Sequence, residues 1–149
     1  MLRKYKIGFD FRGLILFLII MIPNFIWFII PAPNDILRGD SVTPHIDMIA
    51  SICQVLMILF LCIFIRRENN EVKSAKWISL VTICCILYYS CWICYYIGIT
   101  NLLVVIGLTI PPCLAFLFFA IYRKNTIAIL PATIFSLCHL IYAILNLWR

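Results

Sequence analysis

The chain has 149 residues, of which 65% are hydrophobic and only 12% are charged. Soluble domains are about half apolar and about one quarter charged, so this composition excludes an ordinary soluble domain. The net charge of +6 comes from basic residues beside apolar segments, where anionic lipid head groups attract them, so we expect the lipid bilayer and no nucleic acid as their partner.

Five apolar segments are each close to the roughly 20 residues that a helix needs to cross a bilayer. The connections between them are too short to bury a core of their own. The sequence therefore predicts an all-α integral membrane bundle, a single domain with five transmembrane helices over residues 13–30, 46–65, 77–97, 102–122 and 126–147.

The first helix is predicted to end at Pro31 and Pro33, and turn-forming residues follow it. We expect this connection to be irregular, with the hydroxyl of Thr43, ahead of Pro44, capping the second helix. Pro23 falls near the middle of the first helix. A proline there either marks a substrate site, because freed carbonyls become ligands, or only shapes the bundle.

The fourth helix carries a similar interruption at Pro111 and Pro112. Short turns over residues 98–101 and 123–125 predict that the third, fourth and fifth helices are antiparallel neighbours. Glycine is scarce and no Gly-x-x-x-Gly pair occurs, so the sequence offers no argument for helix packing through small residues.

Basic residues gather on every second connection, and ten of the twelve fall on one side of the predicted bundle. The positive-inside rule then places the N-terminus in the cytoplasm and the C-terminus outside. On the inner side are Arg3, Lys4, Lys6, Arg12, Arg66, Arg67, Lys73, Lys76, Arg123 and Lys124, and on the outer side are Arg38 and Arg149.

Polar residues within the predicted spans lie mostly in their outer halves, whereas the inner halves are almost wholly apolar. Hydrocarbon penalises polar groups, so those present usually face the bundle interior or a cavity. Helical spacing puts Asp47, Ser51 and Gln54 on one face, and Ser136, His139 and Asn146 on another. The sequence therefore predicts an outward-facing polar pocket that binds a ligand, lined by Asn24, Asp47, Gln54, Tyr88, Ser136 and His139.

Aromatic residues with polar tips follow the third helix and suit the wall of such a pocket. Those near the membrane surface are expected to be interfacial anchors instead, namely Trp27, Tyr95, Tyr96 and Trp148. His139 either forms a hydrogen bond with a neighbouring helix, carries protons or binds an acidic ligand. No second His or carboxylate lies three or four residues from it, so we expect no metal site, and no motif predicts a cofactor or a catalytic residue.

Cys91 and Cys94 form a Cys-x-x-Cys pair near the outer end of the third helix. This pair resembles that of membrane thiol oxidoreductases of the disulfide-generating and vitamin K epoxide reductase types. The resemblance implies redox cycling with a quinone. Six other cysteines are scattered through apolar spans, where thiols serve as small hydrophobes.

The segment Ile22-Pro23-Asn24-Phe25-Ile26-Trp27, followed by residues 31–35, resembles uncharacterised small multi-pass membrane proteins of low-G+C bacteria. That resemblance implies a location in the cell (plasma) membrane. Five spans in about 150 residues, with Leu130-Pro131 and Phe135-Ser136 in the last, are also similar in plan to the translocator protein (tryptophan-rich sensory protein) family, whose members bind apolar ligands. The Trp-x-Pro-Pro element of that family is absent, so no site residue is carried over.

From these patterns we expect a non-enzymatic membrane protein that binds or transports a small amphipathic or apolar ligand. The first alternative is an accessory subunit of a larger membrane complex, in which the same polar groups hold a membrane protein partner or a second copy of the chain. The second alternative is a membrane thiol oxidoreductase that uses Cys91 and Cys94.

Overall fold

The computed structural model describes residues 4–67 and 75–147. Within these ranges the chain forms five long helices, each long and apolar enough to cross a membrane. The prediction of an all-α multi-pass membrane bundle is therefore confirmed, and the helix bounds agree with the predicted ones to within two residues. They are α1 (Phe11–Ile29), α2 (Pro44–Ile63), α3 (Ala75–Tyr96), α4 (Leu102–Tyr122) and α5 (Thr126–Leu147).

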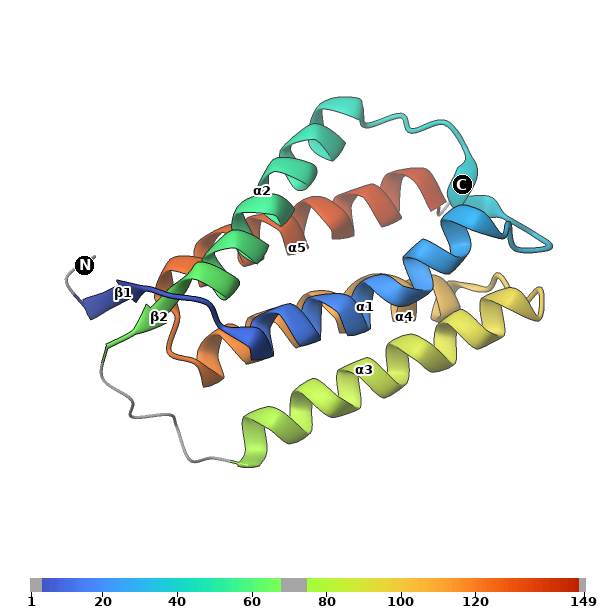
Figure 1. Cartoon of the computed structure of the whole chain (residues 1–149). Helices are drawn as coiled ribbons and strands as arrows, with labels where there is room; N and C mark the ends of the chain where they lie inside the picture. The colour runs from blue at the N-terminus through green and yellow to red at the C-terminus, as the bar shows by residue number, and fades with distance from the viewer. Residues whose placement is uncertain (1–3, 68–74, 148–149) are drawn as a thin grey trace.

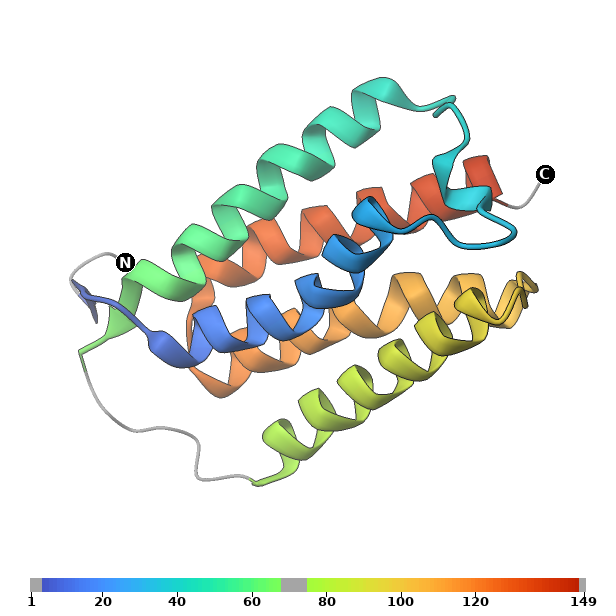
Figure 2. The same cartoon turned by 45° about the vertical axis from the view of Figure 1, so that its right-hand side comes forward.

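Four helices lie side by side in the order α2, α5, α4, α3, and α1 lies against one face of this row (Figures 1 and 2). The neighbours in the row pack most extensively, so α3, α4 and α5 are the antiparallel neighbours that the short turns predicted. α4 is the most buried of the five helices. We call the end with the 123–125 turn the sheet end, and the end with the 30–43 connection the loop end.

A two-stranded antiparallel sheet at the sheet end was not predicted. It pairs β1 (Tyr5–Ile7) with β2 (Phe64–Arg66). The second helix, expected to extend to about residue 65, ends at Ile63, and β2 begins at the next residue. The backbone amides of Gly8 and Asp10 donate to the carbonyls of Ile63 and Cys62, at 3.0 and 2.7 Å. The N-terminal segment thus provides hydrogen-bond donors for carbonyls in the last turn of α2, which a helix leaves without intrahelical partners. After α2 the chain continues in an extended form as β2.

Asparagine and aspartate side chains begin three of the helices. Asp10 accepts from the amide of Arg12 at the start of α1, and Asn101 accepts from Val104 at the start of α4. Asn125 accepts from Ala128 at the start of α5, and its amide also donates to two carbonyls at the end of α2. These contacts satisfy amides that a helix leaves without intrahelical partners.

The predicted cap of α2 was wrong in its chemistry. The hydroxyl of Thr43 makes no hydrogen bond to an amide of the first turn. It lies 3.3 Å from a carboxylate oxygen of Asp47, to which it donates, and accepts from Asn146 Nδ2 at 2.9 Å. Because these side chains occupy the hydroxyl, Thr43 joins the start of α2 to the end of α5. The connection before it is partly regular, with a 3-10 turn η2 (Ile36–Arg38).

Small residues allow close packing of the helices at several points, for which the sequence offered no argument. A Cβ added to Gly107 of α4 would lie 2.0 Å from the sulfur of Cys91, so α3 and α4 approach each other closely there. Four alanines, Ala115, Ala120, Ala128 and Ala132, are completely buried. The last two are four residues apart and share one face of α5. Their spacing is that of a Gly-x-x-x-Gly pair, with alanine in place of glycine.

Pro23 leaves the carbonyl of Ile19 without the amide that a regular helix would provide. The hydroxyl of Tyr89, from α3, donates to that carbonyl at 2.6 Å. α1 remains helical through Pro23, and α4 remains helical through Pro111 and Pro112. At Pro23, therefore, the freed carbonyl holds two helices together.

Candidate functional site

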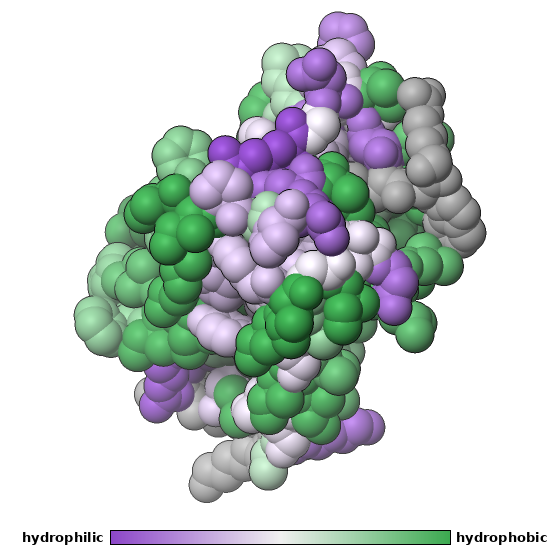
Figure 3. Space-filling view, turned by 90° about the vertical axis from the view of Figure 1, so that its right-hand side faces the viewer, coloured by the Kyte–Doolittle hydropathy of each residue, from purple (hydrophilic) through white to green (hydrophobic). Residues whose placement is uncertain are grey.

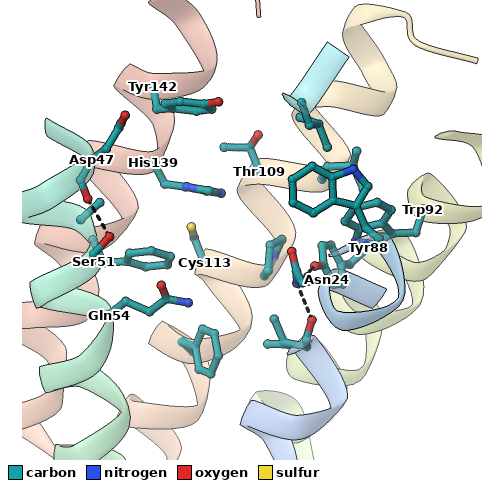
Figure 4. A pocket seen from close by; sticks show the side chains of 18 residues that line it. Asn24, Asp47, Ser51, Gln54, Tyr88, Trp92, Thr109, Cys113, His139 and Tyr142 are labelled. Atoms are coloured by element: carbon teal, nitrogen blue, oxygen red, sulfur yellow. Dashed lines mark hydrogen bonds between the residues drawn. The ribbon is translucent and has the colours of Figure 1, made fainter. Parts of the chain in front are cut away.

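A cavity of about 330 Å³ lies in the half of the bundle nearest the loop end, between all five helices. Its wall is partly apolar, with several polar side chains directed inward (Figure 4). The lining residues are Ile20, Asn24, Trp27, Leu37, Asp47, Ala50, Ser51, Gln54, Tyr88, Trp92, Leu108, Thr109, Pro112, Cys113, Phe116, Phe135, His139 and Tyr142.

Five of the six residues predicted to line a pocket are in this wall: Asn24, Asp47, Gln54, Tyr88 and His139. The sixth, Ser136, is not among the lining residues. Its hydroxyl donates to the carbonyl of Ala132, one turn earlier in α5, at 2.7 Å. A serine in an apolar helix commonly satisfies its hydroxyl in this way, so its polarity alone does not place it in a cavity.

The wall formed by α1 and α3 is held by hydrogen bonds. The amide of Asn24 donates to the hydroxyl of Tyr88 at 2.7 Å and to the carbonyl of Ile20 at 3.0 Å. Trp92 packs edge-on against Tyr88 one turn away. The indole Nε1 of Trp92 is buried and has no hydrogen-bond partner among residues 4–67 and 75–147. This wall therefore contains one hydrogen-bonded pair, Asn24 and Tyr88, and one indole N–H, of Trp92, without an acceptor among the described residues.

The opposite wall, from α2 and α5, carries polar groups with few protein partners. The ring of His139 stacks between Phe135 and Tyr142, with ring centroids 5.3 and 6.4 Å apart, and points into the cavity (Figure 4). Within the described ranges, the hydrogen-bond contact of the Gln54 amide nitrogen is a long one, to the sulfur of Met21 at 4.0 Å. Asp47 lies at the rim of the same wall. The cavity wall formed by α2 and α5 thus carries an imidazole, a carboxamide and a carboxylate.

A hydrogen-bond network at the loop end holds the 30–43 connection beside the cavity. The carboxylate of Asp35 accepts from Trp27 Nε1 at 2.9 Å, from the Tyr95 hydroxyl at 2.8 Å and from Arg38 Nε at 2.8 Å. Burial by itself raises the pKa of Asp35, but the hydrogen bonds from Trp27, Tyr95 and Arg38 and the charge of Arg38 outweigh it, so the pKa lies below its ordinary value. The carboxylate therefore stays ionised at neutral pH.

The same network ends α1. Arg38 Nη2 donates to the carbonyls of Trp27 and Phe28, at 2.6 and 3.2 Å, and its guanidinium lies 5.0 Å from the centre of the Trp27 ring. The hydroxyl of Tyr96 donates to the carbonyl of Ile30 at 2.8 Å. The last carbonyls of α1 are thus satisfied by side chains, as a helix end in an apolar setting requires.

The prediction that Tyr95 is an interfacial anchor was wrong, because the side chain is 0% exposed and bonded to Asp35. Trp27 lines the cavity and donates to the same carboxylate. Trp148 lies outside the described residues.

Seen from the loop end, hydrophilic and intermediate side chains gather in the middle of the molecule and hydrophobic ones lie around them (Figure 3). This end therefore carries its polar groups over the region of the cavity.

Several lining residues were not named as candidates, among them Trp27, Trp92, Cys113 and Tyr142. Helical spacing contained a signal for two of them. Tyr142 follows His139 by three residues, and Trp92 follows Tyr88 by four, so each shares a face with a predicted lining residue. Cys113 follows Thr109, another lining residue, by four residues on α4, but a thiol in an apolar span is commonly a small hydrophobe, so it was not proposed.

All eight cysteines are free thiols in the structure. Cys91 and Cys94 do not line the cavity, and the sulfur of Cys91 packs against Gly107 of α4. No group of three His, Cys, Asp or Glu residues within the described ranges lies close enough to hold a metal ion.

No protein-family model, no curated protein sequence and no solved structure matches this chain.

Proposed function

We propose that this protein binds a small amphipathic or apolar ligand in the cavity at the loop end, and that the cavity faces the outside of the cell membrane. The observation that carries the proposal is the cavity itself, which draws lining residues from all five helices. Its volume of about 330 Å³ falls in the range of small-molecule sites, which combine apolar walls with a few convergent polar groups.

The hydrogen bonding of the wall supports this proposal. Polar side chains are costly in an apolar bundle unless they have partners. Asn24 and Tyr88 are partners of each other, but the buried Trp92 indole has no hydrogen-bond partner among the described residues, and the His139 ring points into the cavity. A ligand with hydrogen-bonding groups would satisfy them. Binding is the core of the proposal, and transport would require the ligand also to leave by another route.

Binding of the neutral fluorescent probe N-phenyl-1-naphthylamine to the purified protein in lipid nanodiscs tests the proposal. We expect saturable binding above the level of empty nanodiscs. Gln54→Leu and His139→Leu each remove a polar group of the wall while keeping a side chain of similar bulk. Each should weaken probe binding at least fivefold while the helical circular dichroism signal stays unchanged.

Two serines provide a matched control, because each hydroxyl donates to a carbonyl one turn earlier in its own helix. Ser51 lines the cavity and Ser136 does not. Of these two serine substitutions, Ser51→Ala is therefore expected to change probe affinity and Ser136→Ala is expected to leave it unchanged. Absence of saturable binding, or equal binding by all of these variants, would contradict the proposal. Repeated co-purification with a stoichiometric membrane protein would instead support an accessory subunit.

A further inference from the structure

The charge of the cavity wall is unbalanced. Asp47 is the one carboxylate among the described residues that line it, and none of them is a lysine or an arginine. A ligand in this space therefore meets a carboxylate at the rim, and no lysine or arginine side chain among the described lining residues. Coulomb interactions over short distances are stronger beside an apolar bundle than in open water, so this imbalance affects which ligands bind.

Asp47 has no cation as a partner within residues 4–67 and 75–147. Its carboxylate accepts one hydrogen bond, from the Thr43 hydroxyl at 3.3 Å. Arg38, also at the loop end, is engaged by Asp35 in an ion pair of 2.8 Å. The other basic residues that the structure describes belong to segments at the sheet end. Asp47 thus keeps acceptor capacity for a group that enters the cavity.

Aromatic rings make up much of the remaining wall. Besides the stacked His139, six aromatic side chains line the cavity: Trp27, Tyr88, Trp92, Phe116, Phe135 and Tyr142. The faces of such rings attract organic cations, and the attraction is larger where water is excluded. The Trp27 ring already has the Arg38 guanidinium 5.0 Å from its centre, which shows that a cation is accommodated at this end of the bundle.

From these observations we infer that the ligand is an amphipathic organic cation. Its ammonium group lies near Asp47 at the rim, and its apolar part lies deeper, among the rings and aliphatic side chains of the wall. An anionic ligand is disfavoured because it would place two like charges together in a partly apolar site. This inference rests on the proposed function and adds the charge of the ligand to it.

A set of three competitors with the same phenylbutyl group tests the inference. They are 4-phenylbutyltrimethylammonium, its neutral isostere with a tert-butyl group in place of the ammonium, and the anionic 4-phenylbutanesulfonate. Each is used to displace N-phenyl-1-naphthylamine from the protein in nanodiscs of uncharged lipid. We expect the cation to compete about tenfold better than the neutral isostere, and the sulfonate to compete worst.

Two isosteric substitutions locate the effect. Asp47→Asn removes the charge of the rim and is expected to abolish the tenfold preference for the cation over the neutral isostere. Asp40→Asn makes the same change of charge at an exposed position of the 30–43 connection, outside the cavity wall, and is expected to keep the preference. The pair separates a contact with Asp47 from the general potential of the loop end.

The possible failures are distinguishable. If the neutral probe shows no saturable binding, the proposed function itself is wrong. If the probe binds but the cation competes no better than its isostere, the cavity binds neutral ligands and the inference about charge is wrong. Equal loss of the preference in Asp47→Asn and Asp40→Asn would also overturn it, because long-range potential would then suffice.

Discussion

Several polar side chains in this apolar chain satisfy backbone carbonyls that would otherwise have no donor. Tyr89 donates to Ile19, the carbonyl that Pro23 frees, and Tyr96 donates to the end of α1. Asn125 donates to two carbonyls at the end of α2. In hydrocarbon an unpaired carbonyl has no water as a substitute, so each of these side chains stabilises one local backbone geometry.

The Tyr89 contact predicts a specific coupling. Tyr89→Phe should lower the free energy of unfolding by about 1 to 2 kcal/mol, because it leaves the Ile19 carbonyl without a donor. In a Pro23→Ala background the same substitution should cost clearly less, because the alanine amide restores the helical hydrogen bond. Denaturant unfolding of the four proteins in detergent micelles measures this double-mutant cycle. An equal cost in both backgrounds would show that the carbonyl is not the reason for the contact.

At the scale of residues, the sequence predicted polar groups better than aromatic ones. Five of the six predicted lining residues line the cavity, because polarity and helical spacing together point to a shared interior face. Tyr95 was placed at the membrane surface from its position near the helix end. Its burial depends on Asp35, sixty residues earlier in the chain, and no local pattern contains such a contact.

At the scale of elements, one carboxylate contributes three of the hydrogen bonds that hold the 30–43 connection in place. Asp35 receives hydrogen bonds from α1, from α3 and from its own segment, and this keeps Leu37 in the wall of the cavity. Since the folded state lowers the pKa of Asp35, its stabilising effect is complete above the ordinary aspartate pKa, near 4, and is lost as pH falls through the lower value of the folded protein.

We therefore expect Asp35→Asn to destabilise the protein at pH 7 by about 2 kcal/mol, because three donors lose a charged acceptor. The difference from the wild type should stay constant between pH 7 and 5 and shrink below about pH 4. Thermal unfolding followed by tryptophan fluorescence across this range measures it. Asp40→Asn, an exposed carboxylate of the same connection, serves as the control, and a similar loss there would refute the assignment to Asp35.

The helices were predictable and the sheet was not, for a physical reason. Each helix satisfies its own backbone, so composition and length over about 20 residues suffice to find it. β1 and β2 are three residues each and satisfy one another across the first two helices. Their pairing depends on where α1 and α2 place the two ends, which is a property of the fold and not of either segment.

At the scale of the molecule, orientation in the membrane stays a prediction. The described basic residues lie at the sheet end except for Arg38, which favours a cytoplasmic sheet end. A cysteine introduced at Asp40 should then react with a membrane-impermeant maleimide in intact cells, and one at Lys124 only after permeabilisation. The wild-type protein controls for labelling of the native thiols. The reverse labelling pattern would invert the topology and place the cavity on the cytoplasmic side.

The contacts of Tyr5 imply an order of assembly. Its hydroxyl accepts from the amide of Thr126 and lies 2.7 Å from the hydroxyl of the same residue, 121 positions later in the chain. The ribosome therefore synthesises four of the five helices before the first strand meets its last partner. Until Thr126 is made, the N-terminal segment can pair with β2 and with the carbonyls at the end of α2, but the hydroxyl of Tyr5 lacks this partner. The contact between Tyr5 and Thr126 therefore forms late in synthesis.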